Sequence, residues 1–385
     1  MENKNLLILN GAVFVNGKLE KKDVRIENGF FAEIAEPGAL DGIVDRATLG
    51  DSVEFVLDAT DKYIIPGLVD VHTHGRIGFD FSKITEEDLE KLLVSYSACG
   101  VTNVVATTMT NEPVVVEESL HVLGEYMREQ ENGTKKGAKL LGIHMEGPFL
   151  GKEKKGAHDE KYLQNPDWKQ FEKWQKLSGE NIRLITIDPC LAGAEEFIKK
   201  CVASGVKVSL GHTACHYDTA VKAVQAGADH VTHAFNGMGL LNHREPGLMG
   251  AAMDTGMYTE LICDGIHVHP AMVRMMFAAH PEQMVLISDS IAAAGLPEGE
   301  YSSGGFKVTV KEGKAVLDNG IIAGSVISIY EAMVNAIRFG VPAEIAVNSA
   351  TYLAAKSIGM EDVAGSIAVG RRADFLVADK EWKIV

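Results

Sequence analysis

The feature that most constrains the fold of this chain is a regular alternation of short apolar runs and amphipathic segments, which starts after Pro66-Gly67 and continues to Gly340. Short, continuous apolar runs are typical of buried parallel strands. The eight strand candidates are Leu68–His72, Thr102–Thr107, Lys139–Met145, Arg183–Ile187, Val206–Leu210, His230–Ala234, Tyr258–Cys263 and Met284–Ser288. Eight successive strand–helix units predict a (β/α)8 TIM barrel.

Helical spacing of apolar residues fills most of the intervals between these runs. The predicted helices are Glu86–Ser97, Ala194–Ala203, Asp218–Ala226, Ala271–Ala279 and Ile327–Phe339. Thr85 and Asp88 have the spacing of a capping box before the first of them, and Gly100 follows its end. A doubly wound parallel sheet is the alternative fold. The absence of a G-x-G-x-x-G motif at any strand-to-helix turn favours the barrel.

Both ends of the chain have β character instead. Asn16-Gly17 and Asn28-Gly29 are two-residue hairpin turns, because both positions of a type I′ turn need a positive φ. The tail of the chain is again strand-like. We therefore predict a small β-sandwich domain built from residues 1–65 and 348–385, flanking a catalytic barrel domain of residues 66–347.

One segment of the barrel domain departs from the alternation. Residues of about 305–322 read as a β-hairpin insertion after the eighth strand, with Glu312-Gly313 as its turn.

The charge of the chain excludes some classes of partner. Lys and Arg number 37 against 53 Asp and Glu, so the net charge is −16. Such a chain is repelled by nucleic acid and by anionic membrane surfaces. The five Cys residues are widely spaced without a CxxC pair, which indicates reduced thiols. With no signal-peptide pattern and no apolar run of the roughly 20 residues that span a bilayer, a cytoplasmic protein is predicted.

The strongest chemical signal is Asp70-Val71-His72-Thr73-His74 at the end of the first barrel strand. Residues two apart on a strand point to the same face, so His72 and His74 can both face the barrel mouth. Imidazole pairs of this kind suit Zn²⁺ and similar divalent ions. The alternative is a pair of core or solvated histidines. The position directly after Pro66-Gly67 favours a metal site.

Four other strand ends carry residues of the same chemical kind. They are Glu146 after the third strand, His212 after the fifth, His233 after the sixth and Asp289 after the eighth. TIM-barrel enzymes place catalysis at the carboxyl ends of the strands. Each residue alone could be an ordinary surface group, but chance would have scattered such residues over helices and loops. His144 lies one pleat deeper than Glu146, so we expect it to support the ligands or pack in the core.

In two stretches, Pro66–His74 and the tail Gly365–Asp374, the chain resembles the amidohydrolase superfamily. Within the superfamily it is similar to N-acetylglucosamine-6-phosphate deacetylases over nearly the whole chain, with the motifs in the family's order. The matching stretches are His144–Phe149, Lys155–His158, Thr232–Met238, Arg244–Gly247, Cys263–His267, Ser288-Asp289, Ala292–Gly295 and Ala323–Ser325.

The resemblance implies a metal-dependent deacetylase that uses zinc, iron or another divalent ion, with one or two ions per chain. Glu146, His212 and His233 would hold the first ion, and His72 and His74, with Glu146 as a bridge, the second. Asp289 would be the general base and acid for a metal-activated water.

The resemblance also implies contacts to a phosphosugar. The matching positions are His158, Asn236, Gly237, Arg244 and His267. Arg244 would reach the phosphate in the neighbouring subunit's site, which implies a homodimer. Two positions depart from the family: Ser349 stands where relatives often have Pro, and Gly237 replaces a more usual Ala. The second departure leaves the sugar pocket less defined.

Two competing interpretations remain. Another amidohydrolase, of the dihydroorotase or hydantoinase type, would usually bridge its metals with a carboxylated Lys. The only Lys of the third strand, Lys139, lies at its start, far from the ligand end. A non-catalytic scaffold would typically have lost ligand histidines or the aspartate of the eighth strand, and this chain keeps all of them.

Overall fold

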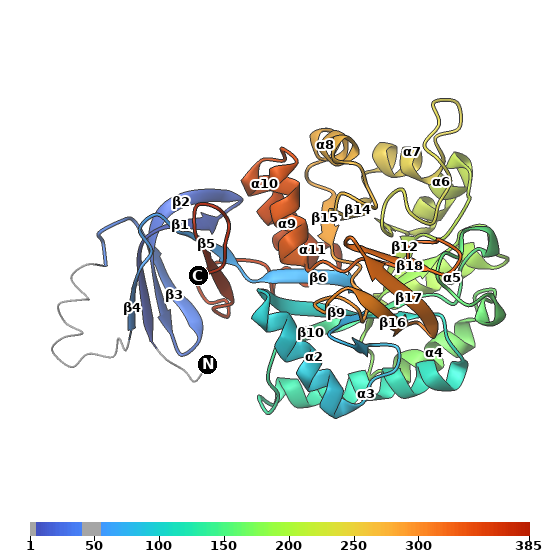
Figure 1. The fold of residues 1–385 in the computed structure, drawn as a ribbon, viewed down its shortest axis with the longest axis horizontal. Coiled ribbons are helices and arrows are strands. Elements are labelled where there is room, and N and C mark those ends of the chain that lie inside the picture. Colours follow the sequence, from blue (N-terminus) through green and yellow to red (C-terminus); the bar gives the residue numbers. More distant parts are fainter. Residues whose placement is uncertain (1–4, 41–54) are drawn as a thin grey trace.

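The computed structural model describes residues 5–40 and 55–385. A barrel of parallel strands is surrounded by helices, and a smaller β-sheet from both ends of the chain lies to one side (Figure 1). The barrel strands pair in chain order. They are β6 (Leu68–Thr73), β9 (Val101–Met109), β10 (Lys139–Glu146), β11 (Ile182–Ile187), β12 (Lys207–Leu210), β13 (His230–Val231), β14 (Tyr258–Ile262) and β15 (Met284–Ile287). All eight predicted strands are therefore confirmed.

The last strand meets the first through hydrogen bonds at their carboxyl ends. The backbone N–H of Asp289 donates to the carbonyl of His72 at 2.9 Å. The Ser288 hydroxyl donates to the buried Asp70 carboxylate at 2.5 Å. The end of β15 is thus fixed beside the end of β6, where the sequence places its catalytic candidates.

Helices cover the outside of the barrel and bury their apolar sides against the strands. They are α2 (Glu86–Ala98), α3 (Pro113–Glu131), α4 (Trp168–Leu177), α5 (Ala194–Ala203), α6 (Tyr217–Ala226), α7 (Gly247–Thr255), α8 (Pro270–Ala279), α9 (Ile329–Arg338), α10 (Ala343–Ser349) and α11 (Tyr352–Ser357). All five predicted helices are present within two residues of the expected bounds. Thr85 caps α2 by accepting the backbone N–H of Asp88, as its spacing predicted. Within the described residues no helix is both long and apolar enough to cross a membrane.

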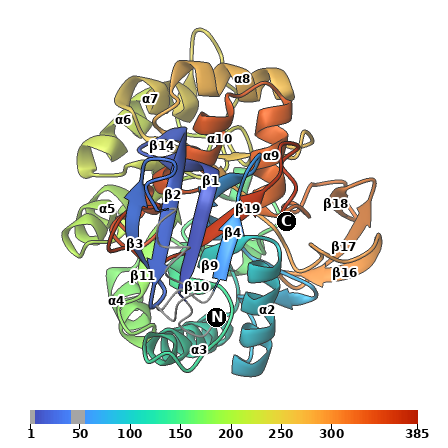
Figure 2. The same cartoon turned by 90° about the vertical axis from the view of Figure 1, so that its left-hand side faces the viewer.

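The smaller sheet joins β1 (Leu6–Val15), β2 (Lys18–Glu27), β3 (Phe30–Ala35), β4 (Phe55–Asp58), β5 (Tyr63–Pro66) and β19 (Phe375–Ala378). The two hairpin turns at residues 16–17 and 28–29 have the positive φ angles that were expected. Figure 2 looks onto this part of the molecule. The described strands belong to one hydrogen-bonded network, in which β1 pairs with β4 through its first half and with β5 beyond an irregularity at Ile8–Gly11.

The helix α11 belongs by its packing to the barrel. Ala354, Ala355 and Ile358 pack against buried side chains of the barrel strands, among them Val69 and Val285. The predicted small domain began at residue 348, so this helix does not fit that division, although the tail with β19 does.

The insertion after the eighth strand is larger than a hairpin. β17 (Phe306–Lys311) and β18 (Lys314–Leu317) pair around Glu312-Gly313 as predicted, and β16 (Gly299–Ser303) adds a third strand. A short ribbon, β7 (Gly75–Arg76) with β8 (Phe79–Asp80), follows β6. The insertion and its flanking loops form one wall of the cavity described next.

Candidate active site

A cavity of about 280 Å³ opens at the carboxyl ends of the barrel strands. It brings together nine of the eleven residues that the sequence singled out. They are His74, Glu146, His158, His212, His233, Asn236, Gly237, His267 and Asp289. His72 lies directly behind them, fully buried. Arg244 is the exception: its side chain is exposed, bonds to His243, and does not line the cavity of its own chain.

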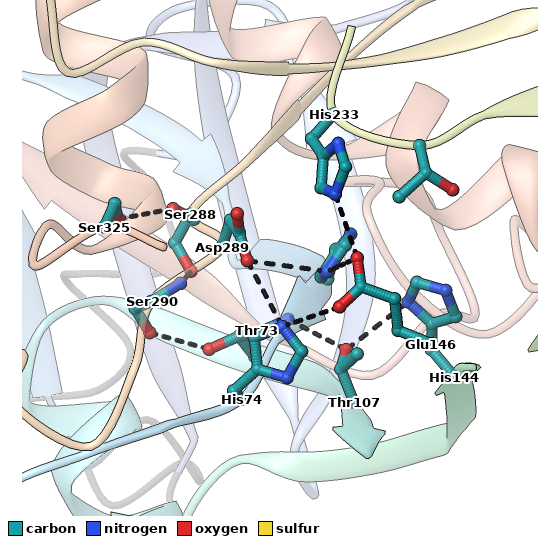
Figure 3. A network of polar contacts seen from close by, with 12 residues as sticks. Thr73, His74, Thr107, His144, Glu146, His233, Ser288, Asp289, Ser290 and Ser325 are labelled. Atoms are coloured by element: carbon teal, nitrogen blue, oxygen red, sulfur yellow. Dashed lines mark hydrogen bonds and ion pairs between the residues drawn. The ribbon is translucent and has the colours of Figure 1, made fainter. Parts of the chain in front are cut away.

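Glu146 is the centre of the site, as Figure 3 shows. Its Oε1 lies 2.9 Å from Nε2 of His233 and 3.1 Å from Nε2 of His212. Its Oε2 lies 3.2 Å from Nε2 of His74 and 3.3 Å from Nε2 of His158. One carboxylate at the end of β10 therefore faces imidazoles from four different segments of the chain.

Asp289 faces the other side of the same histidines. Its Oδ1 lies 3.3 Å from Nε2 of His74 and 3.5 Å from Nε2 of His72 (Figure 3). His72 Nε2 is also 3.5 Å from Glu146 yet makes no hydrogen bond to any described residue. A buried ring nitrogen without a partner, aimed between two carboxylates, is an arrangement that a cation would complete.

The ring tautomers point to the same conclusion. His212 Nδ1 lies 2.8 Å from the carbonyl of Lys154, and His233 Nδ1 lies 3.1 Å from that of Asn236. Each Nδ1 must be protonated to donate to a carbonyl, so in the neutral ring, the form that binds a metal, Nε2 has the lone pair. The two Nε2 atoms are only 3.1 Å apart, beside Glu146 Oε1. Three acceptors so close together need a positive charge between them.

These distances match a metal site. Ligands of tetrahedral zinc at ~2.1 Å are about 3.4 Å from one another. Two of the metal-type clusters found in the described residues lie here, His72–His74–Glu146 and Glu146–His158–His212. The donor set of imidazoles and carboxylates therefore fits a divalent transition metal such as Zn²⁺.

Both carboxylates are ionised in these surroundings. Burial alone would raise the pKa of Glu146, but the positive field of His72 and hydrogen bonds from the other imidazoles outweigh it and hold that pKa well below its usual range. Burial likewise opposes ionisation of Asp289, and the charges of His72 and His74 bring its pKa to about 2. Burial lowers the pKa of His158 to about 4, so that ring is neutral at pH 7.

The backbone is strained where it delivers three of these side chains. His212, His233 and Asp289 have φ angles of 47°, 30° and 48°, in the left-handed region that residues with a side chain seldom adopt. At His233 this ends β13 after two residues, where the sequence predicted a strand through Ala234. The turn tips each side chain into the cavity, and strain of this kind concentrates at functional sites.

The contacts of the remaining predicted residues hold them in place. His267 Nδ1 lies 2.6 Å from Asp264 Oδ2, which fixes the ring at the cavity wall. Gly237 has a φ of 59°, and a Cβ there would lie 3.1 Å from the His212 ring. The positive φ and this close contact both favour glycine at this position of the present chain. His144 hydrogen-bonds to Thr186 at 2.8 Å and lies behind the ligands, as expected.

Sequence reasoning missed two groups of residues. The first is Glu260, fully buried on β14, whose Oε2 lies 2.8 Å from His72 Nδ1. Its signal was present: it is a single charged residue inside an apolar strand. The second is the part of the cavity wall formed by Ser303, at the end of β16, and by Ile321 and Ile322, which follow β18 in the insertion.

Comparison with known proteins places this site in a family. The profile of the amidohydrolase family matches residues 63–384. The chain belongs to this family. It is 34% identical to an N-acetylglucosamine-6-phosphate deacetylase of Bacillus subtilis, over 84% of this chain and 83% of that one. It is 32% identical to an N-acetylgalactosamine-6-phosphate deacetylase of Escherichia coli O157:H7, over 84% and 85% of the two chains.

Solved structures agree. An aspartate-to-alanine variant of the N-acetyl-D-glucosamine-6-phosphate deacetylase from Mycobacterium smegmatis, in complex with N-acetyl-D-glucosamine-6-phosphate, superposes with a TM-score of 0.89. The two chains are 28% identical, with 99% of this chain and 97% of that one covered. This amidohydrolase is a hydrolytic enzyme, and the scaffold interpretation is set aside.

Metal content tests the geometry of this amidohydrolase directly. We expect one or two divalent ions per chain in the purified protein, loss of hydrolase activity on chelation, and its return when the ion is restored. His72→Ala removes one ring from the second site only, so the metal count measured by elemental analysis should fall from two to one. Full activity in metal-free protein would contradict the metal site. A count of one in both proteins would contradict the binuclear arrangement.

Proposed function

We propose that this amidohydrolase hydrolyses the acetamide of N-acetylglucosamine 6-phosphate to glucosamine 6-phosphate and acetate. The observation that carries the proposal is the convergence of Glu146 and its surrounding imidazoles on one cavity with an ionised Asp289. Relatives named as deacetylases of two N-acetylhexosamine 6-phosphates are 34% and 32% identical to this chain over 84% of its length, which supports the proposal.

The residues divide the work of amide hydrolysis between them. A divalent ion held by Glu146, His212 and His233, with a second on His72 and His74, would supply Lewis-acid activation of water and of the carbonyl. We propose zinc as the ion, with iron as the alternative. Asp289, ionised and at the cavity edge, accepts the proton of the attacking water as its oxygen bonds to the carbonyl carbon.

Asp289 then completes the reaction. An amine leaves poorly as an anion, so the same carboxyl group returns the proton to the sugar nitrogen as the C–N bond breaks. The products are acetate and the free amine. His267, held by Asp264, and neutral His158 lie on the cavity wall where they can hydrogen-bond the acetamide and the sugar hydroxyls.

The phosphate needs a cation from elsewhere. Among the described residues that line the cavity there is neither a Lys nor an Arg. Arg244 is exposed on the loop before α7, beside Leu240, which is 90% exposed. A loop with an exposed guanidinium and an exposed apolar residue is suited to reach a second subunit. We therefore propose a cytoplasmic homodimer in which Arg244 binds the phosphate in the partner's cavity.

A substrate comparison tests the proposed function. Amine release should be fastest with N-acetylglucosamine 6-phosphate, and slower by a factor of roughly 10–100 with unphosphorylated N-acetylglucosamine, since a charge-assisted phosphate contact is lost. The galactose epimer, N-acetylgalactosamine 6-phosphate, is the third arm because one relative is named for it. A preference for that epimer would reassign the sugar, and no amine release from any of the three would refute the deacetylase assignment.

Asp289→Asn tests the proton transfer. Asn has the same shape but cannot accept and return a proton, so we expect kcat to fall by about 10²–10⁴-fold with the metal content unchanged. Asp254→Asn is the control, because Asp254 is an acidic residue on the outside of the barrel that accepts a hydrogen bond from the Tyr217 hydroxyl. Near-normal kcat in the Asp289 variant would exclude the role.

Arg244→Ala tests the shared site. We expect a KM for the phosphorylated substrate raised by the equivalent of roughly 2–3 kcal/mol and little change with the unphosphorylated sugar. Mixing Arg244→Ala chains with Asp289→Asn chains should restore activity, since a hybrid dimer has one cavity with both residues intact. If hybrid dimers form without any recovery, Arg244 does not act across a subunit boundary.

A further inference from the structure

Glu260 is a buried charge that the proposed mechanism does not use. It lies in the middle of β14 between Thr259 and Leu261, and neither the residue nor its neighbours on the strand reach solvent. A carboxylate is costly to bury without partners, so a residue of this kind inside an apolar strand needs compensating contacts.

Its carboxylate makes two contacts, both to candidate metal ligands. Oε2 lies 2.8 Å from Nδ1 of His72. The same oxygen accepts the backbone N–H of His233 at 3.1 Å. In addition, the carbonyl of Glu260 accepts the backbone N–H of Ala234 at 2.8 Å. One residue of β14 thus holds the end of β6 and the strained turn that follows β13.

The cluster of Glu260, His72 and His144 could be taken for a third metal site, because its ligand atoms lie close together. The contacts contradict this. Both ring nitrogens of His144 have hydroxyl partners, Thr107 and Thr186. All three residues are fully buried, and none of them lines the cavity, so the cluster supports the site from behind.

We propose that Glu260 is the positioning residue that sets the geometry of both candidate metal sites at once. By accepting the Nδ1 proton of His72, it fixes the tautomer in which Nε2 carries the lone pair, and it turns that atom toward Glu146 and Asp289. By accepting the N–H of His233, it stabilises a backbone at a φ of 30° that would otherwise relax.

The inference rests on the proposed metal site. It adds that the two ion positions depend on the same residue, Glu260. His72 belongs to the second site and His233 to the first, and they come from strands that are not neighbours in the barrel. Because one oxygen atom holds both, a change at Glu260 should weaken metal binding without removing any ligand.

Two conservative variants separate hydrogen-bond geometry from charge. Glu260→Gln keeps an oxygen at the same reach but loses the charge, and its NH2 replaces Oε1, which has no partner among the described residues. Glu260→Asp keeps the charge but withdraws the oxygen by about one bond length from His72 and His233. Zn²⁺ affinity of the metal-free proteins is measured by competition with a chelating dye, after circular dichroism has shown that each variant is folded.

We expect Glu260→Asp to weaken Zn²⁺ binding by roughly 10–100-fold and Glu260→Gln by less than about tenfold. Asp23→Asn is the matched control: Asp23 is fully buried and accepts two backbone N–H groups, but it lies in the small sheet. It should lower the unfolding temperature and leave Zn²⁺ affinity unchanged.

The inference is overturned if Glu260→Asp binds Zn²⁺ as tightly as the wild type, or if Glu260→Gln loses as much affinity as Glu260→Asp, since charge rather than position would then matter. If the Asp variant does not fold, Glu260→Met takes its place, because Met has a similar volume but lacks the oxygen that accepts from His72 and His233. A 10–100-fold loss of Zn²⁺ affinity is then expected, and wild-type affinity overturns the inference. A wild-type protein that binds no Zn²⁺ or other divalent ion would refute the metal site itself, which is a different result from unequal variants of a metal-binding enzyme.

Discussion

The site depends on one buried carboxylate, Glu146, and on the imidazoles that surround it. A lone carboxylate in the mouth of a barrel would take up a proton, because burial disfavours its charge. Here histidines from β6, from the loop after β10, and from the ends of β12 and β13 keep it ionised. When these rings are neutral, the charge of Glu146 also stabilises a metal cation bound by their Nε2 atoms, whose lone pairs would otherwise repel one another. Neither the buried carboxylate nor the cluster of imidazoles is stable without the other. The fold must therefore place Glu146 and the histidines within hydrogen-bond distance of one another.

The barrel places these side chains by means of strained backbone conformations at the ends of its strands. His212, His233 and Asp289 leave their strands through left-handed backbone conformations, each costing on the order of 1–3 kcal/mol. The strands behind them are buried on both faces and can bear this cost. Hydrogen bonds such as Ser288 to Asp70 and His233 to Glu260 hold the turned segments in place. The stable barrel therefore compensates for both the backbone strain and the buried charges, and it holds together side chains that would not cluster without it.

The features of this structure that could be predicted from the sequence are those that depend on residues close together in the chain. Apolar runs and their spacing identified all eight barrel strands, because burial of parallel strands depends on residues within a few positions of one another. Strand ends with His, Glu or Asp identified five of the residues that line the cavity, and the family resemblance added His158, Asn236, Gly237 and His267. By contrast, α11 was assigned to the small domain, although it packs on the barrel. That packing depends on segments distant in sequence, because Ala354 and Ala355 of α11 share one buried cluster with Val69 of β6. The contact of Glu260 with His72, 188 positions away, could not be read from either neighbourhood alone.

The cavity is lined both by residues at the barrel strand ends and by residues of the insertion, and this bears on which sugar the enzyme takes. Relatives named for the glucose and the galactose epimer are 34% and 32% identical to this chain, so overall identity does not separate the two. Both reactions break the same acetamide bond, and in the proposed mechanism the residues at the strand ends carry out that common chemistry. The epimers differ in one hydroxyl of the ring, which a cavity wall must sense. The insertion contributes one such wall: Ser303 of β16, with a buried hydroxyl that has no partner among the described residues, and residues 321–324. Since a site that hydrogen-bonds one hydroxyl discriminates more strongly than an apolar wall does, choice between the epimers is expected to reside in the insertion rather than in the barrel.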